Sequence, residues 1–298
     1  MQCAGHAQSG ERDLCWMMNA PSTQPMVSVC IPAYRGAAHI RETIGSVLAQ
    51  TFPDFEVLII DDASPDDTAA IASSFGDSRV RCLSNPQNLG PQGNWNRCLA
   101  EATGRYFKLL PQDDVLAPDC LQREVEVLEA DRHHQIALVF CARTIIDAHG
   151  RQVLVRRTLG RTASAMTAAT LFRRCLRRGT NVIGEPGGVL FRRDLAKTVG
   201  PFDATFPYVV DLDYWFRLLA HGDGYYLPET LVSFRVSPGA WSVAIGANQA
   251  AEFRGLAAKM VKDGALSAGM LDLAVGRMLA PLNNVLRVLL YRFLFARR

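Results

Sequence analysis

Glu56-Val57-Leu58-Ile59-Ile60-Asp61-Asp62 is a short apolar run that ends in two adjacent carboxylates. The arrangement returns at residues 105–114, where an apolar run leads through Pro111 and Gln112 to Asp113 and Asp114. Runs of this length that are rich in β-branched or aromatic residues predict buried strands. Ligands of an open α/β sheet bind at the ends of its strands, so we expect both carboxylate pairs at one edge of the sheet.

Short apolar runs alternate with segments of helical spacing on either side of this stretch. Residues 27–31 form the first run, and apolar residues recur at helical spacing over residues 39–50. Ser64 is predicted to be the N-cap of a helix that ends near Phe75. This alternation predicts an α/β fold with a mostly parallel central sheet, flanked by helices and including a Rossmann-like half.

Composition and charge limit the classes of function. The chain has 298 residues, of which 49% are hydrophobic and 20% charged, and its net charge of +3 does not indicate a nucleic-acid groove. Its eight cysteines contain no Cys-x-x-Cys pair, which favours a reduced, cytoplasmic setting. Residues 1–25 have no continuous apolar stretch, so we expect a loosely ordered leader instead of a signal peptide.

The C-terminal residues 244–298 are predicted to be a helical extension. Apolar residues from Leu282 to Leu294 form a stripe at helical spacing, and the chain ends in Arg297 and Arg298. No stretch reaches about 18 uninterrupted apolar residues. Two alternatives stay open: a helix packed on the domain or on a second subunit, as in a homodimer, and an interfacial helix in peripheral contact with a membrane.

The carboxylates each have a structural and a chemical interpretation. Asp61-Asp62 is either a polar turn or a site that accepts hydrogen bonds from a nucleobase or ribose. Asp113-Asp114 is either a solvated loop or a site for Mg²⁺ or Mn²⁺, which one or two carboxylates hold together with substrate phosphates. Asp211 and Asp213 begin a predicted helix, where they either complement the helix dipole or supply a general base.

Four ordered motifs resemble the inverting family 2 glycosyltransferases of the GT-A fold. They are residues 27–34 (ending in Pro32-Ala33-Tyr34), residues 59–68 (containing Asp61-Asp62), Gln112-Asp113-Asp114, and residues 211–218. The resemblance covers about residues 26–243, and four motifs in order are far more specific than one. Gln112 departs from the usual acidic or small residue, and Ser237 stands where many members have a histidine.

The resemblance implies roles for particular residues. Asp211 matches the catalytic base and Asp114 the ligand of a Mn²⁺ or Mg²⁺ cofactor. The positions implied to bind the nucleotide sugar are Pro32, Ala33, Tyr34, Asp62, Asn88, Asp113 and Arg217. Residues 26–146 would then bind the nucleotide sugar, and residues 147–243 would form the acceptor half.

The implied activity is transfer of a sugar from a nucleotide-diphosphate donor to a hydroxyl of a glycan or lipid-linked acceptor. The implied setting is bacterial surface polysaccharide synthesis, in the cytoplasm or at the inner face of its membrane. The Arg-rich residues 151–178 favour an anionic or lipid-phosphate-linked acceptor. Two alternatives are an inactive nucleotide- or glycan-binding module of the same fold and a nucleotidyltransferase, whose glycine-rich, basic phosphate loop is absent here.

Overall fold

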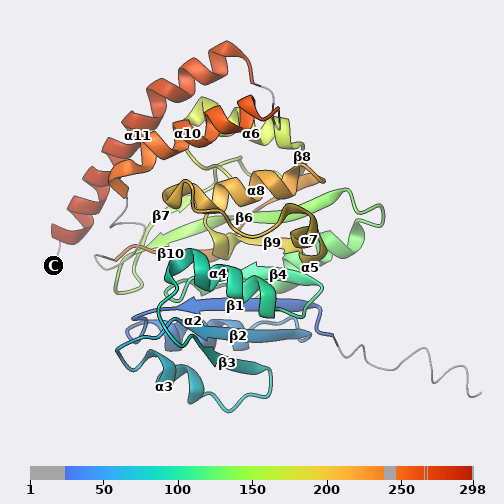
Figure 1. Ribbon diagram of the computed structural model, residues 1–298, viewed down its shortest axis with the longest axis vertical. Coiled ribbons are helices and arrows are strands. Elements are labelled where there is room, and N and C mark those ends of the chain that lie inside the picture. Colours follow the sequence, from blue (N-terminus) through green and yellow to red (C-terminus); the bar gives the residue numbers. More distant parts are fainter. Residues whose placement is uncertain (1–23, 238–245, 265, 267, 297–298) are drawn as a thin grey trace, which may run out of the picture.

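A ten-stranded mixed sheet forms the centre of the computed structural model, which describes residues 24–237, 246–264, 266 and 268–296 (Figure 1). Eight strands follow the order β3-β2-β1-β4-β9-β6-β10-β5, while β7 pairs with β6 and β8 with β10. The strands are β1 (Val27–Ala33), β2 (Phe55–Asp61), β3 (Val80–Ser84), β4 (Tyr106–Leu109), β5 (Val115–Leu116), β6 (Ile136–Ile146), β7 (Gln152–Arg156), β8 (Ser164–Met166), β9 (Val189–Arg192) and β10 (Asp223–Arg235).

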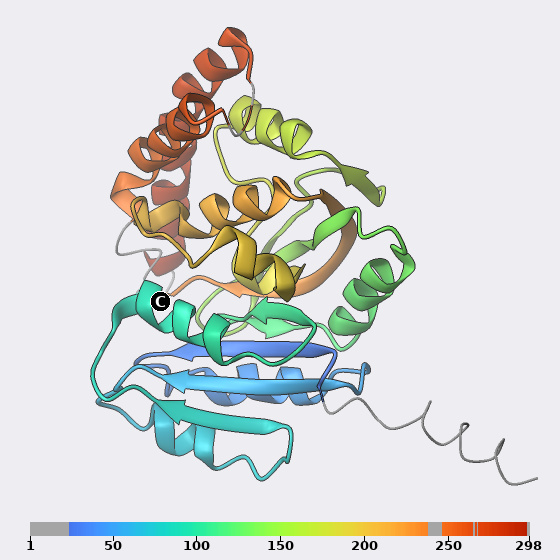
Figure 2. The ribbon, with the colours of Figure 1, turned by 45° about the vertical axis from the view of Figure 1, so that its right-hand side comes forward.

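Helices cover both faces of this sheet, as the alternating sequence pattern predicts. In Figure 2, strands β1, β2 and β3 lie side by side at the lower end of the molecule and the C-terminal helices at the upper end. The α-helices are α2 (Ile40–Leu48), α3 (Thr68–Ser73), α4 (Gly90–Glu101), α5 (Cys120–Ala130), α6 (Ala168–Arg178), α7 (Ala196–Val199), α8 (Val210–Leu219), α10 (Gln249–Lys262) and α11 (Met270–Ala296).

The first four strands of the order, β3, β2, β1 and β4, are parallel to one another. Their side chains alternate between two cores: Cys30 of β1 packs on the side of α4 and α8, whereas Val29 and Ile31 pack on the side of α2 and α5. A strand with both faces covered is mostly apolar, which explains the long apolar runs in the sequence. The buried exceptions have polar partners: Lys108 of β4, for example, pairs with Glu124 of α5. The parallel pairing also brings the carboxyl ends of β1, β2 and β4 to one edge.

The remainder of the sheet mixes both directions. Strand β9 is antiparallel to β4 and β6, while β10 is parallel to β6. The sequence pattern predicts a last strand over residues 231–236, but β10 begins at Asp223. Register shifts on either side of Thr230 let the long strand continue past Pro228, which a search for uninterrupted apolar runs does not detect.

The helix after β2 begins later than predicted. Helix α3 starts at Thr68, and no side-chain cap bond is found at its N-cap, Asp67. Ser64 instead accepts a hydrogen bond from the backbone N–H of Arg35, 3.0 Å away, and donates its own N–H to Asp61. The Ser64 capping prediction is therefore wrong, because this hydroxyl joins the loops after β1 and β2.

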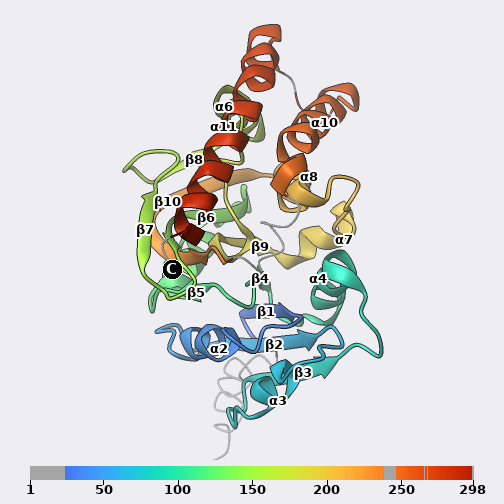
Figure 3. The same ribbon diagram turned by 90° about the vertical axis from the view of Figure 1, so that its left-hand side faces the viewer.

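The predicted C-terminal helical extension is present as α10 and α11. Figures 1 and 3 show α11 running along one side of the molecule, from beside α6 towards β7. One side of α11 packs on α6 and α10, while Leu282, Leu286 and Leu289 are exposed. By length and composition alone, the helix over residues 270–291 could cross a membrane. Polar residues, including Arg277 and Arg287, interrupt its apolar sequence. The predicted leader falls mostly on residues 1–23, which lie outside the described residues.

Candidate active site

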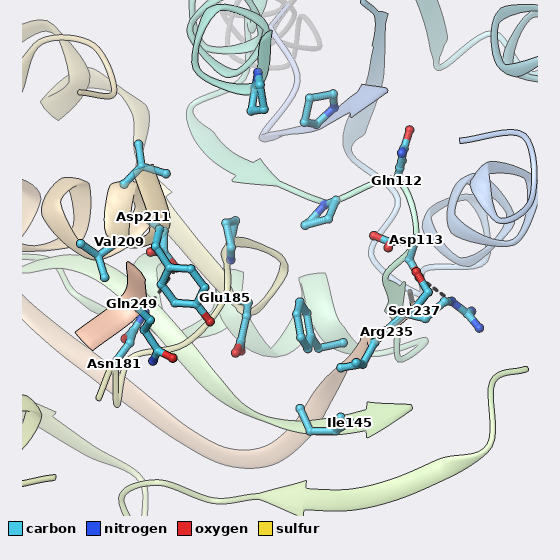
Figure 4. A pocket seen from close by; sticks show the side chains of 18 of the residues that line it. Gln112, Asp113, Ile145, Asn181, Glu185, Val209, Asp211, Arg235, Ser237 and Gln249 are labelled. Carbon is cyan, nitrogen blue, oxygen red and sulfur yellow. Dashed lines mark hydrogen bonds between the residues drawn. The ribbon is translucent and has the colours of Figure 1, made fainter. Parts of the chain in front are cut away.

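A cavity of about 910 Å³ lies at the carboxyl ends of β1, β2 and β4 and extends beneath α8 and α11. It is lined by the predicted residues Pro32, Ala33, Tyr34, Asp62, Asn88, Asp113 and Asp211. Figure 4 shows Gln112, Asp113 and Arg235 at one side and Asn181, Asp211 and Gln249 at the other, with Glu185 between them. Three carboxylates far apart in sequence thus share one cavity.

Asp62 is held rigidly at the first end of this cavity. One of its oxygens, Oδ1, accepts hydrogen bonds from the side chain of Asn85 and from the backbone N–H of Leu89, which is 2.8 Å away. Asn88 donates its side-chain amide to the Asp62 carbonyl at 3.1 Å. Because no described residue donates to Oδ2, Asp62 retains an acceptor for a ligand.

Gln112 joins two of the cavity-lining loops. Its amide oxygen accepts from the backbone N–H of Tyr34 at 2.8 Å, and its amide nitrogen donates to the Tyr34 carbonyl at 2.9 Å. Gly36 passes so close that a Cβ there would overlap the Gln112 amide. Gln112, an unusual residue for the motif in the sequence, therefore holds Tyr34 at the cavity wall, where its ring is 40% exposed.

The two carboxylates of Asp113-Asp114 face different surroundings. Asp113 lines the cavity, and burial raises the pKa of its carboxyl to about 6. Asp114 has no exposed surface and is not part of the cavity lining; its Oδ1 accepts from the backbone N–H of Arg235 at 2.9 Å. Burial, and next the Asp113 charge, raise the Asp114 pKa well above its ordinary value. The other carboxylate oxygen of Asp114, Oδ2, is buried without a hydrogen-bond partner among the described residues. The role of Asp114 as a metal ligand therefore stays a prediction, and Asp113 is the carboxylate that lines the cavity.

Arg235 fixes both of these aspartates. Its Nε donates to the Asp113 carbonyl at 2.8 Å, and its guanidinium pairs with Glu42 of α2 at 2.6 Å. The side chain is almost completely buried, so it supports the loop instead of offering a free cation. A divalent cation fits the cavity-facing Asp113, since one carboxylate plus substrate phosphates is a sufficient donor set for Mg²⁺ or Mn²⁺.

Asp211 begins helix α8 at the other end of the cavity. Its Oδ1 accepts from the Leu212 N–H at 2.7 Å and its Oδ2 from the Asn181 amide at 3.3 Å. Burial, with a smaller contribution from the charge of Glu185, raises the pKa of Asp211 to about 7. A carboxylate with a pKa near neutrality is suited to accept a proton from a substrate.

Glu185 is a cavity carboxylate that the sequence motifs do not reveal. It forms an ion pair with the buried Arg143 of β6. Although burial opposes ionisation, the guanidinium groups of Arg143 and Arg156 hold the Glu185 pKa below its ordinary value. Glu185 is thus a weaker base than Asp211. No local sequence pattern marks Glu185, because its partner Arg143 lies on β6, about 40 residues away in the chain, and the two come together only in the folded protein.

Arg217 does not line the cavity, contrary to the prediction that it contacts the donor. Its Nε donates to Asp213 at 2.8 Å and its Nη1 to the Val199 carbonyl at 2.7 Å, while its guanidinium lies over the Tyr214 ring. Residues four apart on a helix are neighbours, so Arg217 pairs with Asp213 and not with a ligand. Its role is to tie α8 to the end of α7.

The mixed sheet, its flanking helices and the cavity at the strand ends define an α/β fold of the GT-A class. A solved structure with this fold is the mannosyltransferase PcManGT from Pyrobaculum calidifontis in complex with GDP-Man and Mn²⁺. Its TM-score is 0.62 and its identity 20%, with 96% of this chain and 80% of that chain covered.

Residues 28–200 match the sequence model of Glycosyl transferase family 2, and the chain belongs to this family. The uncharacterized protein MT1568 of Mycobacterium tuberculosis is 31% identical over 225 residues, covering 74% of this chain and 70% of that protein. A third relative is the Escherichia coli UDP-Glc:alpha-D-GlcNAc-diphosphoundecaprenol beta-1,3-glucosyltransferase WfgD. It is 34% identical over 103 residues, covering 35% of this chain and 41% of WfgD.

Proposed function

We propose that this glycosyltransferase moves a sugar, with inversion, from a nucleotide-diphosphate donor to a hydroxyl of a glycan or lipid-linked acceptor. The observation that carries the proposal is the shared cavity of Asp62, Asp113 and Asp211, with a pKa of about 7 for Asp211. The name of the relative WfgD, a glucosyltransferase that acts on a diphosphoundecaprenol-linked sugar, agrees with this class of reaction.

The donor occupies the end of the cavity formed by the strand ends of β1 and β2. Pro32, Ala33 and Tyr34 line the nucleoside pocket, and the free Oδ2 of Asp62 accepts a hydrogen bond from the base. Asn88 keeps the Asp62 loop in place through its bond to the Asp62 carbonyl. Asp113, which lines the cavity, and Asp114, whose buried Oδ2 has no partner among the described residues, would hold Mn²⁺ or Mg²⁺. The cation would stabilise the charge that develops on the leaving diphosphate.

Asp211 acts as the general base. It takes the proton of the acceptor hydroxyl while that oxygen forms a bond to the anomeric carbon from the face opposite the nucleotide. The bond between the anomeric carbon and the diphosphate oxygen breaks in the same step, and the nucleoside diphosphate leaves with the electron pair. Asn181 orients the Asp211 carboxylate through its bond to Oδ2. Such a base contributes typically about 10²- to 10⁴-fold in rate.

The test is incubation with a panel of UDP-, GDP- and dTDP-sugars plus Mn²⁺, with detection of the released nucleoside diphosphate. Release from one donor class that Asp211→Asn lowers by at least about a hundredfold, without loss of donor binding, is the expected result. Donor binding without release in any mixture of acceptors would indicate an inactive binding module, and release of pyrophosphate a nucleotidyltransferase. Cytoplasmic location, and contact of α11 with a membrane or a second subunit, stay predictions.

A further inference from the structure

Three arginines from separate elements gather at the Asp211 side of the cavity. Arg143 of β6, Arg156 of β7 and Arg287 of α11 all line it. Arg143 and Arg156 are register partners in the antiparallel pair β6–β7, so two like charges stand directly opposite each other. Such a cross-strand pair is destabilising unless an anion lies between or beside the two charges.

The protein itself neutralises only part of this charge. Glu185 interacts electrostatically with all three guanidinium groups and is in contact with Arg143. Nη1 of Arg143 is buried without a hydrogen-bond partner. Arg287 contacts the Tyr208 hydroxyl and lies over the Tyr208 ring, 5.4 Å from its centroid. Within the described part of the chain, Glu185 is therefore the one carboxylate that acts on all three guanidinium groups, and Asp211 acts on Arg143.

The desolvation of these groups supports the same conclusion. Burial, and next the neighbouring charge of Arg143, lower the pKa of Arg156 to about 10. Burial also lowers the pKa of Arg287 below its ordinary value. A site that holds guanidinium groups at such a cost gains stability from any ligand that supplies negative charge.

The arginine cluster is separate from the proposed donor end. Arg235, which holds Asp113, is the register partner of Ile146 at the end of β6, and Arg143 lies three residues earlier on that strand. The electrostatic neighbours of Asp211 include Glu185 and Arg143, whereas among the described residues the cation that acts on Asp113 is Arg235. A ligand on the arginine cluster is thus beside the general base and beyond the donor diphosphate.

We propose that Arg143, Arg156 and Arg287 form an anion subsite that binds a phosphate or diphosphate of the acceptor and so brings the acceptor hydroxyl to Asp211. This inference rests on the proposed function and adds the chemical class of the acceptor. The fork of a guanidinium group matches two phosphate oxygens at once, which suits arginine to this task. Of the arginines in residues 151–178, Arg156 alone lines the cavity; its two partners come from β6 and α11.

The first experiment measures the subsite with the donor site filled. Full-length protein is saturated with Mn²⁺ and whichever of UDP, GDP or dTDP it binds, and inorganic pyrophosphate is then titrated by calorimetry. We expect saturable binding that is about tenfold weaker in Arg156→Gln and in Arg287→Gln, because each loses a charge-assisted contact. Arg287→Lys, which keeps the charge, should recover part of the affinity.

Arg161→Gln is the matched control, since Arg161 is exposed and makes no contact in the cavity. Unchanged nucleotide affinity in Arg156→Gln and Arg287→Gln would exclude a general loss of structure. Pyrophosphate binding that is absent from the wild type, or equal in all variants, would overturn the anion subsite. Failure of every nucleotide to bind would instead refute the proposed function.

A second titration, with farnesyl diphosphate, separates two sources of the same chemistry. Tighter binding than that of inorganic pyrophosphate supports a lipid-linked diphosphate acceptor. Equal binding supports a water-soluble phosphorylated acceptor. Binding of farnesyl diphosphate that is insensitive to Arg156→Gln and Arg287→Gln would show that its tail alone is recognised and would contradict the proposal.

Discussion

Asp211→Asn should make the enzyme slower and, above neutral pH, more stable. In the folded protein, burial raises the pKa of Asp211 from 3.8 to about 7. The folded state therefore holds this proton more tightly than the unfolded state does. The stability that the group contributes is complete below about pH 3.8 and is lost as the pH rises through about 7. An asparagine, neutral at every pH, avoids this loss.

The structure sets a ceiling for the effect. The pKa of Asp211 is about three units higher in the folded than in the unfolded state. At about 1.36 kcal/mol per unit, this difference corresponds to about 4 kcal/mol of unfolding free energy. Because Asp211 is partly exposed to an open cavity, solvent screens its charge, and we expect about 1–2 kcal/mol at pH 8. The gain of Asp211→Asn over wild type should be smaller at pH 5 and level off above pH 7.

Urea unfolding followed by tryptophan fluorescence at pH 5, 6, 7 and 8 measures this gain. Asp54→Asn is the control: Asp54 is exposed, and its side chain makes no hydrogen bond or ion pair with a described residue. Transfer activity of wild type should rise with pH through about 7 as Asp211 loses its proton. A stability difference between Asp211→Asn and wild type that is the same at pH 5 and pH 8 would refute the reasoning, as would full activity in the variant.

Three further substitutions separate the remaining roles. Asp113→Asn should weaken nucleotide binding at least about tenfold in Mn²⁺ and leave metal-free binding unchanged; equal loss in both conditions would count against a metal ligand. Gly36→Ala should displace the Gln112 amide and raise the nucleotide Kd about tenfold, measured by calorimetry, because two hydrogen bonds are broken. Arg217→Ala should lower the unfolding free energy by about 2 kcal/mol, measured in urea, since Asp213 is left buried without its Nε partner. Its nucleotide affinity should stay that of wild type, and a large loss of affinity would return Arg217 to the donor site.

Local patterns were sufficient for the parallel half of the sheet. Strands β1, β2 and β4 are mostly apolar and their helices show regular spacing, so local sequence is enough to predict them. The predicted start of strand β10 was wrong because Pro228 and the register shifts beside Thr230 interrupt the apolar pattern. Pairing with β6 nevertheless keeps residues 223–235 in one strand. Ser64 has the sequence of a cap, but the Arg35 N–H competes for its hydroxyl.

The sequence predicted those residues of the candidate site whose position depends on one nearby element. Asp62 directly follows β2 and Asp211 lies in the first turn of α8, and both line the cavity. Which of Asp113 and Asp114 faces the cavity depends on Arg235 of β10. Its backbone N–H binds the side chain of Asp114, and its Nε binds the main-chain carbonyl of Asp113. Glu185 and the arginine cluster are assembled from distant segments, and no local motif marks them.

Helix α11 contributes Arg287 to the cavity although it lies beyond the segment matched by the family. In the proposed anion subsite Arg287 joins Arg143 and Arg156, which lie inside that segment, so the subsite is built from both parts of the chain. Chimeras joined after β10 should keep the nucleotide preference of the first segment's parent, while exchange of the last fifty or so residues would change the anion subsite only at Arg287.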